Sequence, residues 1–354
     1  MNRSDLSHQV RAALKRLPPP YASHYGVVPY PPPAVSPSIL PVARECQSAS
    51  TALARLETLV SELGDPWLVS RILMRREAVS GSAIEGTNST LDELLAAEET
   101  GNAAGHEAAI QVKDYAFCLD AGVPDAIALG PSIFSAGLVR GLHRSVMKSE
   151  GGYADTPGEP RANVVWIGGR GDIAYSTYNP APPQDIGRCL ADNIAYMRGE
   201  ADEVFPPSLL TRMAVAHAHF EAVHPFTDGN GRVGRLLLPL MMAAQGHTPL
   251  YLSPYIDAHP FGTQTEFPDI KLHHPTRRTS PLGPLRCGPP AQHQSGDGLD
   301  RVSTTRVVTP KRGLDRLRRR WADHHHAVVD DPPRPRHPAG MADGQYRHTQ
   351  EPSQ

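Results

Sequence analysis

Proline placement is the feature that most restricts how this chain of 354 residues can fold. Prolines crowd into 17–42, where Pro-Pro-Pro occurs twice, and they recur after about His259. Proline has no backbone N–H and a fixed φ, so such stretches cannot build helices or central strands. We therefore expect an extended Pro-rich arm over 1–42 and a disordered tail over 259–354. Because the Arg, Pro and His bias of the tail is typical of GC-rich DNA read out of frame, an aberrant tail is the alternative.

Between these stretches, apolar residues recur at helical spacing. From about 43 to 78 they return every three or four residues with one break at Gly64-Asp65-Pro66, which predicts a helical hairpin. Further helices are predicted near 90–99, 106–120, 132–147, 184–198, 208–222 and 231–245. Two β-prone runs, 163–167 and 173–177, flank a glycine-rich break and predict one surface hairpin. The sequence therefore predicts a mainly α fold.

Composition restricts the class of function. The 35 basic and 37 acidic residues nearly cancel, so no global field favours nucleic acid or an anionic membrane surface. The four cysteines form no CxxC pair, which is typical of reduced thiols rather than of a disulfide framework or a zinc site. No secretory signal or long apolar run is recognisable. We expect a soluble, cytoplasmic protein with no membrane partner.

One string of twelve residues, HPFTDGNGRVGR at 224–235, lies between two segments with helical periodicity. A glycine-rich loop that opens a helix presents unpaired backbone N–H groups and the positive end of the helix dipole to one point. Gly229 and Gly231 allow a phosphate to approach the backbone closely. Arg232 and Arg235, three residues apart, are able to hold further phosphate oxygens. The string therefore predicts a site for a polyphosphate.

Two further residues of the string predict chemistry at that site. Asp228 places a carboxylate beside the phosphates, where it usually carries a divalent metal, and Mg²⁺ is the default. His224 supplies a neutral imidazole that can take a proton from an incoming hydroxyl. Taken singly, these residues are more often a helix end, a turn and a solvated face. A metal-hydrolase site built with His217 and His219 is not favoured, because residues two apart in a helix point to different faces.

The string resembles the signature of the Fic family, HPFx(D/E)GNGRxxR, at every specified position, and the similarity runs from about residue 15 to about 258. The resemblance implies a mainly α, Fic-type helical bundle with a β-hairpin flap. It also implies a helical N-terminal Fic extension over 43–125 and a Fic catalytic domain over 126–258.

The resemblance implies a nucleotidyltransferase, a protein adenylyltransferase that moves AMP from ATP onto a hydroxyl of a target protein. His224 would be the catalytic base and Asp228 would hold Mg²⁺. The remaining residues of the string would bind ATP: Gly229, Asn230 and Gly231 the α- and β-phosphates, Arg232 the leaving group and Arg235 the γ-phosphate, with Phe226 anchoring the loop. The target protein would pair with the flap strand formed by Asn163, Val164, Val165, Trp166 and Ile167.

A segment upstream, 80–87, resembles the inhibitory motif of this family, (S/T)xxxE(G/N), carried on a helix. The resemblance implies that Glu85 pairs with Arg235 and so denies that arginine to the γ-phosphate of ATP. Gly81 stands where the motif has Ser or Thr. Because glycine disfavours helix, we expect this autoinhibition to be leaky.

Two other functions stay open. The same site would serve a de-AMPylase if Glu85 positioned an attacking water, and the chain would be a catalytically weak regulatory or antitoxin-like binding protein if helices missing after 258 were needed for folding. A homodimer is a further option. Nucleic acid is not expected as a partner, since no C-terminal winged helix is recognisable.

Overall fold

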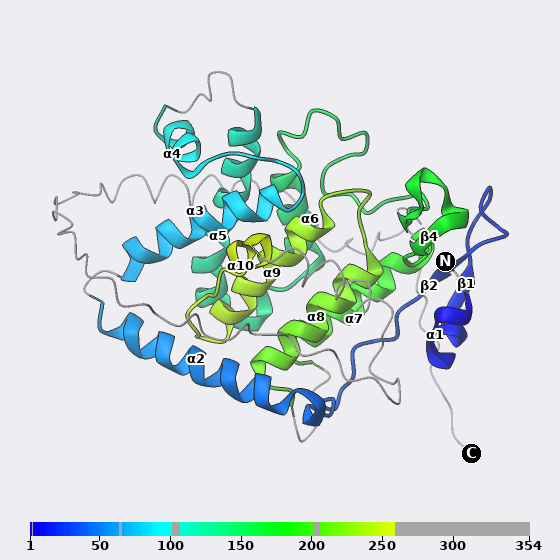
Figure 1. Cartoon of the computed structure of the whole chain (residues 1–354), viewed down its shortest axis with the longest axis horizontal. Helices are drawn as coiled ribbons and strands as arrows, with labels where there is room; N and C mark the ends of the chain where they lie inside the picture. The colour runs from blue at the N-terminus through cyan, green and yellow to red at the C-terminus, as the bar shows by residue number, and fades with distance from the viewer. Residues whose placement is uncertain (2, 64–65, 101–106, 201–205, 259–354) are drawn as a thin grey trace, which may run out of the picture.

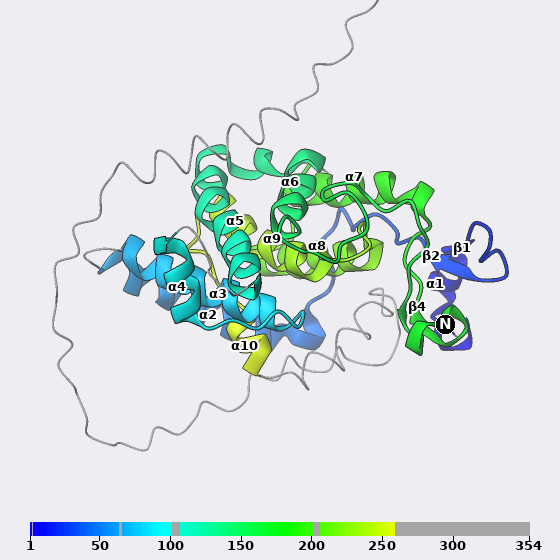
Figure 2. The same ribbon diagram turned by 90° about the horizontal axis from the view of Figure 1, so that it is seen from above.

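Helix α5 (Glu107–Leu129) lies at the centre of the fold and packs against α3, α4, α6 and α9 (Figures 1 and 2). The structure is a computed structural model that describes residues 1, 3–63, 66–100, 107–200 and 206–258; the predicted tail lies outside these residues. The other helices after residue 42 are α2 (Ala43–Ser61), α3 (Pro66–Ala83), α4 (Leu91–Thr100), α6 (Ala136–Val146), α7 (Ile186–Arg198), α8 (Leu209–Val223), α9 (Asn230–Ala244) and α10 (Ser253–Ala258). The mainly α fold predicted from the sequence is confirmed.

Helix α5 runs farther than its periodicity indicates. The prediction ended it near 120, but it continues through Pro124 to Leu129. Gly122 lets α9 come close, since a Cβ at that position would lie 3.0 Å from Leu240 Cδ2. Leu119 and Val123 are buried in the main core. This burial offsets the backbone hydrogen bond that a proline cannot donate.

Helix α3 is fixed to its neighbours by a buried ion pair. Arg75 donates from both terminal nitrogens to the two carboxylate oxygens of Asp120 in α5, each at 2.6 Å, and Glu98 of α4 lies 3.0 Å away. Helix α4 begins with a capping box: Glu93 N–H donates to Thr90 Oγ1, and Thr90 N–H donates back to Glu93 Oε2. The ion pair of Arg75 thus joins the middle of α3 to α4 and α5.

The N-terminal segment, residues 3–28, is folded, and the prediction of an extended arm is wrong there. It contains α1 (His8–Ala12) and two antiparallel strands, β1 (Leu14–Arg16) and β2 (Tyr25–Val27). Its prolines lie in the connection between the strands, where a turn is closed by Tyr21 N–H donating to Pro18 O. Proline excludes helix and central strand but permits such a turn.

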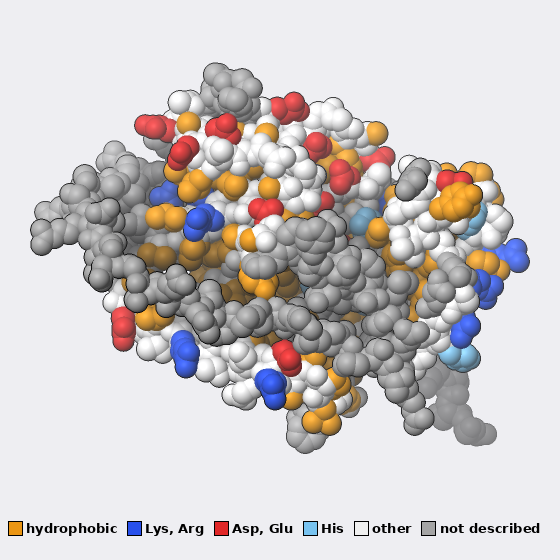
Figure 3. Space-filling model, in the orientation of Figure 1, with side chains coloured by type: hydrophobic (Ala, Val, Ile, Leu, Met, Phe, Trp, Pro, Cys, Tyr) orange, Lys and Arg blue, Asp and Glu red, His pale blue; other side chains and the backbone are white. Residues whose placement is uncertain are grey.

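The N-terminal segment packs beside the flap at one end of the molecule (Figures 1 and 2). Leu6, Val10 and Val27 form a buried cluster with Tyr178 and Ala222. Val27 N–H also donates to Asn179 O at 2.9 Å. Exposed arginine and lysine side chains gather over this segment (Figure 3): Arg3, Arg11, Lys15 and Arg16.

The flap is shorter than predicted. Its strands are β3 (Ile167–Gly168) and β4 (Ser176–Tyr178), which pair antiparallel with Ile167 opposite Tyr178. Between them the run expected to be a strand over 173–177 begins as a 3₁₀ turn, because the Asp172 carboxylate caps Ala174 N–H at 2.8 Å. Residues 163–166 are likewise not a strand; Arg161 holds Asn163 O at 2.9 Å and draws the backbone out of the ladder.

In the part of the chain that the structure describes, no helix combines the length and apolar character needed to cross a membrane.

Candidate active site

Helix α8 ends at His224, which has φ 50° and ψ 64° and is the one non-glycine residue with positive φ among those described. Its N–H still bonds Phe220 O at 2.9 Å, so it closes the helix in a left-handed conformation. That conformation costs a non-glycine residue about 1–2 kcal/mol. The imidazole lies beside the buried Glu221, with His224 Nδ1 3.9 Å from Glu221 Oε2.

The loop after His224 is closed by Asn230. The Asn230 side chain accepts from Phe226 N–H at 2.9 Å and donates to Phe226 O at 2.8 Å. The Phe226 ring is fully buried and stacks on His143 with centroids 3.7 Å apart, so the loop is anchored as expected. Both polar ends of the Asn230 side chain are thereby used within the loop. We therefore expect Asn230 to contact a phosphate through its backbone N–H rather than through its side chain.

His143 supports the loop from α6. Gly158 N–H donates to His143 Nδ1 at 2.8 Å, so the ring proton is on Nε2, which donates to Asp228 O at 3.0 Å. Burial lowers the pKa of His143 to about 4. The ring is therefore neutral at physiological pH and acts as a fixed spacer between α6 and the loop.

The low pKa of His143 predicts a pH-dependent stability. The unfolded chain binds a proton near pH 6.5 and the folded chain only near pH 4, so stability falls as pH drops through that window. We expect the free energy of unfolding, measured by urea titration, to fall by about 2 kcal/mol from pH 6.5 to pH 5. His143→Gln should remove this part of the slope. An unchanged slope in that variant would assign the pH dependence to other groups.

Helix α9 begins directly after the loop and presents its first N–H groups there. Gly229 precedes it with φ 75°, a left-handed conformation that suits glycine. The N–H groups of 230–232 belong to the first turn, where α-helices leave N–H groups without an intrahelical partner. Arg232 and Arg235, in the first turns of α9, are buried. The Nε atom of each has no hydrogen-bond acceptor among the described residues. An anion at this end of α9 would satisfy these donors.

The other groups of Arg232 are held by residues of the α6 end. Its Nη1 lies 3.1 Å from Glu150 Oε2 and its Nη2 lies 3.1 Å from Met147 Sδ. Asp228 Oδ2 is 3.9 Å from Arg232 Nη2, and the Asp228 side chain is 62% exposed. A single exposed carboxylate beside an anion site fits Mg²⁺, which binds proteins through few carboxylates plus phosphates and water.

Glu85 reaches this site from α3. Its Oε1 lies 2.6 Å from Arg235 Nη2, and the same nitrogen donates to Gly81 O at 2.9 Å. A Cβ at Gly231 would overlap Glu85 Oε1, so the carboxylate lies over the first turn of α9. Glu85 itself is in the turn just after α3, not within the helix. A negative charge thus already lies at the helix end that the sequence assigned to phosphate.

Close packing around position 81 explains why a glycine stands there. A Cβ there would lie 3.1 Å from the Tyr115 ring and 3.2 Å from Ser253 Oγ. These two residues bind the buried Glu77: Tyr115 Oη donates to Oε1 at 3.2 Å, and Ser253 N–H donates to Oε2 at 2.8 Å. Burial raises the pKa of the Glu77 carboxyl. Glycine at 81 therefore lets α3 pack closely on α5 and α10, whereas the sequence suggested only a loosened helix.

The target-binding residues predicted on the flap differ in exposure. Asn163 is exposed, and Val164, Val165, Trp166 and Ile167 are half-buried. Trp166 contacts Tyr21 of the N-terminal segment edge-on, with ring centroids 5.5 Å apart. The link between flap and loop is Arg161, whose N–H donates to Pro225 O at 2.9 Å.

Sequence reasoning missed four residues that shape the site: His143, Glu150, Arg161 and Glu221. The first three are more than a helix away from the loop in the chain, and nothing local marks them. Glu221 lies three residues before His224, and that helical spacing is the one signal that could have revealed it.

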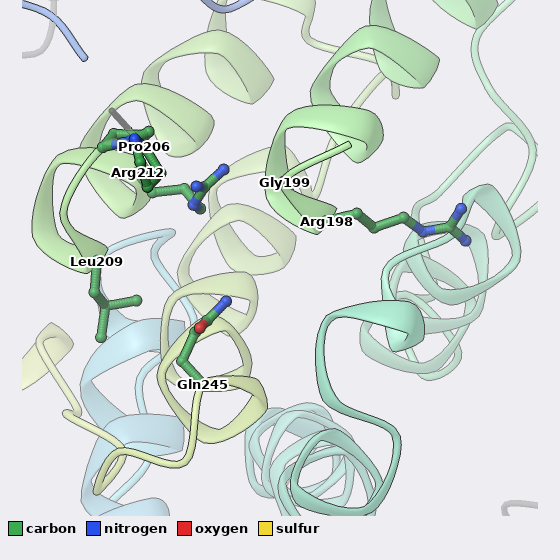
Figure 4. Close-up of a pocket in the computed structure, with 7 residues that line it drawn as sticks. Arg198, Gly199, Pro206, Leu209, Arg212 and Gln245 are labelled. Atoms are coloured by element: carbon green, nitrogen blue, oxygen red, sulfur yellow. The ribbon is translucent and has the colours of Figure 1, made fainter. Parts of the chain in front are cut away.

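A separate pocket of about 290 Å³ lies between the ends of α7, α8 and α9 (Figure 4). Arg198, Arg212 and Gln245 help to line it, but Arg198 points away from the other two and donates to Phe134 O at 2.6 Å. No group of three metal-binding side chains occurs within the described ranges.

Comparison with known proteins finds matches to family models, to relatives and to solved structures. The Fic/DOC family N-terminal region matches residues 43–124, and the Fic/DOC family domain matches residues 133–242. Over 113 residues the chain is 35% identical to protein adenylyltransferase fic-1 of Caenorhabditis briggsae and 34% identical to that of Caenorhabditis elegans. In both cases the match covers 31% of this chain and 20% of the relative, so the chain spans about a fifth of their length.

A solved structure of a Fic family protein from Desulfovibrio desulfuricans G20 is 21% identical, with a TM-score of 0.49 over 69% of this chain and 72% of that one. The two family domains together take in α2 through most of α9, including the loop and the flap. The chain therefore belongs to the Fic/DOC family.

Proposed function

We propose that the chain is a protein adenylyltransferase that transfers AMP from ATP to a hydroxyl of a target protein. The observation that carries this proposal is the pair of buried arginine Nε groups without acceptors, those of Arg232 and Arg235, at the start of α9. Unsatisfied buried donors cost about 1–3 kcal/mol each, and phosphate oxygens would satisfy them. The relatives named above carry the same activity in their names.

The reaction uses few groups. The target oxygen forms a bond to the α-phosphorus of ATP, the bond from that phosphorus to the bridging oxygen breaks, and pyrophosphate leaves. His224 accepts the hydroxyl proton; because its Nδ1 is buried beside Glu221, Nε2 is the nitrogen that receives it. Arg232 and the first turn of α9 stabilise the charge on the departing pyrophosphate. Asp228 would hold Mg²⁺, which neutralises phosphate charge when bound.

The flap provides the route for the target. The backbones of Val164, Val165 and Trp166 form no hydrogen bond with another residue in the described part of the chain. On its other side the flap is already bonded to β2 through Val27 and Asn179. An extended target segment would therefore add at 164–166, and its backbone would supply most of the affinity.

Glu85 would keep this enzyme in a resting state. Its carboxylate binds the guanidinium that the γ-phosphate needs, so ATP and Glu85 compete for Arg235. The Glu85 side chain is 31% exposed, which lets it leave the site without unfolding the core. A carboxylate at this place also favours a second candidate, removal of AMP from modified protein, in which Glu85 would position a water.

The proposal is tested by incubating the protein with ATP labelled at either the α- or the γ-phosphate and measuring which label becomes bound to protein. In the Glu85→Gly background we expect label from the α-phosphate, and none from the γ-phosphate, to become bound to protein. Asp228→Ala should lower the incorporation at least about tenfold, and excess Mg²⁺ should restore little of it. Asp192→Ala, which removes a carboxylate on α7, is the matched control and should change nothing. Incorporation of γ-label would instead indicate phosphoryl transfer, and metal-independent incorporation would exclude Asp228 as a ligand.

A further inference from the structure

Arg161 is a buried arginine between the flap and the catalytic loop. Its side chain donates to four backbone carbonyls: His224 O at 2.7 Å, Asn163 O at 2.9 Å, Ala181 O at 2.6 Å and Val223 O at 3.4 Å. The residue is 4% exposed, and no carboxylate in the described ranges forms an ion pair with it. Burial lowers the pKa of Arg161 to about 10, so the guanidinium is still charged at physiological pH.

A buried cation without a counter-ion is expensive, because carbonyls replace only part of the lost hydration. An apolar side chain of similar volume would avoid that cost, but it would leave these four carbonyls without a donor. The contacts of Arg161 therefore matter for the segments that they join. The four carbonyls share one property. They belong to separate segments whose relative position decides where a target bound to the flap would lie.

Those segments are the two ends of the flap and the end of α8. Asn163 is where the flap begins, Ala181 follows β4 where the flap returns, and His224 is the residue in the left-handed conformation. One rigid, planar guanidinium thus joins the flap to the backbone of the base. Lysine, with one nitrogen, cannot span the same carbonyls.

We propose that Arg161 is a positioning residue that sets the register between the flap and His224, so that a hydroxyl on a target segment paired with the flap lies over the imidazole. The inference rests on the proposed AMP transfer. Arg161 contacts the backbone of the base and of the flap, and it adds no group to the anion site formed by α9 and its arginines. Its loss should therefore affect transfer to protein and leave ATP binding unchanged.

The test compares three proteins in the Glu85→Gly background: the parent, Arg161→Lys and Arg212→Met. The acceptor is the full chain carrying His224→Ala, which offers its own hydroxyls but lacks the base. Arg212 is the matched control because it is 6% exposed and also donates to a backbone carbonyl, Tyr196 O at 2.6 Å, at the far end of α8. Initial rates with α-labelled ATP give kcat, the KM for ATP and the KM for the acceptor, and thermal unfolding gives Tm.

We expect Arg161→Lys to lower kcat about 100-fold, since a misplacement of about 1 Å costs that much, with both KM values within twofold of the parent. Arg212→Met should lower Tm and leave kcat unchanged below the transition. A kcat for Arg161→Lys within threefold of the parent would overturn the inference. A parallel loss of kcat, ATP affinity and Tm would also overturn it, because it would show that Arg161 only stabilises the fold. If the Glu85→Gly parent itself transfers no label from the α-phosphate to protein, the proposed function is wrong, and the inference about Arg161 is not what failed.

Discussion

Glu85→Gly is expected to raise the initial rate of AMP incorporation from ATP by about 10- to 100-fold. Glu85 Oε1 lies 2.6 Å from Arg235 Nη2, and the arginine is buried. A hydrogen bond to a charged partner in such surroundings is worth about 1.5–3 kcal/mol. ATP has to displace the Glu85 carboxylate before it can bind Arg235. Removing that carboxylate should therefore strengthen productive ATP binding by the same free energy, at about 1.4 kcal/mol per factor of ten. The measurement is incorporation of α-label at ATP concentrations below saturation.

Two further variants show whether the gain passes through this contact. Glu85→Gln keeps the size of the side chain without its charge and should give an intermediate rate. Arg235→Ala combined with Glu85→Gly should lose the gain, because both changes act on one pair. A wild-type rate equal to that of Glu85→Gly, with both proteins clearly active, would contradict autoinhibition by Glu85.

His224→Ala is expected to lower transfer by about 10²- to 10⁴-fold, the usual contribution of a general base. The affinity for ATP, measured by titration calorimetry, should stay within about twofold because the imidazole contributes no phosphate contact. Alanine is strained at φ 50°, so the variant also loses about 1 kcal/mol of stability. His224→Asn separates the two effects, since asparagine tolerates this conformation but supplies no base. Residual transfer within tenfold of the parent in both variants would exclude His224 as the base.

The loop of the candidate site could be located from the sequence because its residues are local in the chain. The glycines, arginines, Asp228 and His224 fall in one run of twelve residues, and the helix that follows fixes their geometry. The pairing of Glu85 with Arg235 came from the family resemblance, and the structure places the two side chains in contact. What the sequence could not reveal is the use of Asn230, whose side chain closes the loop on Phe226.

Tertiary contacts explain the other differences between the predicted and the observed fold. The prolines of the N-terminal segment exclude helix, but nothing in the sequence shows that Tyr178 and Ala222 would bury Leu6 and Val10. Helix α5 continues through Pro124 because α9 packs against it. Arg161 carries no signal of its own: its carbonyl acceptors are set by the path of the flap.

Gly231 has a genetic consequence. A side chain at this position would overlap Glu85 Oε1 and come within 2.9 Å of Arg235 Nη1, so it would crowd the anion site and displace the carboxylate at once. We therefore expect that no single substitution at Gly231 releases the proposed autoinhibition while keeping AMP transfer. In a selection for hyperactive alleles, we expect the changes to gather at the end of α3 and in the turn that carries Glu85, and to be absent from 224–235. If Glu85 is the proposed brake, the path from a silent to an active allele then lies in the turn that carries Glu85 rather than in the catalytic loop.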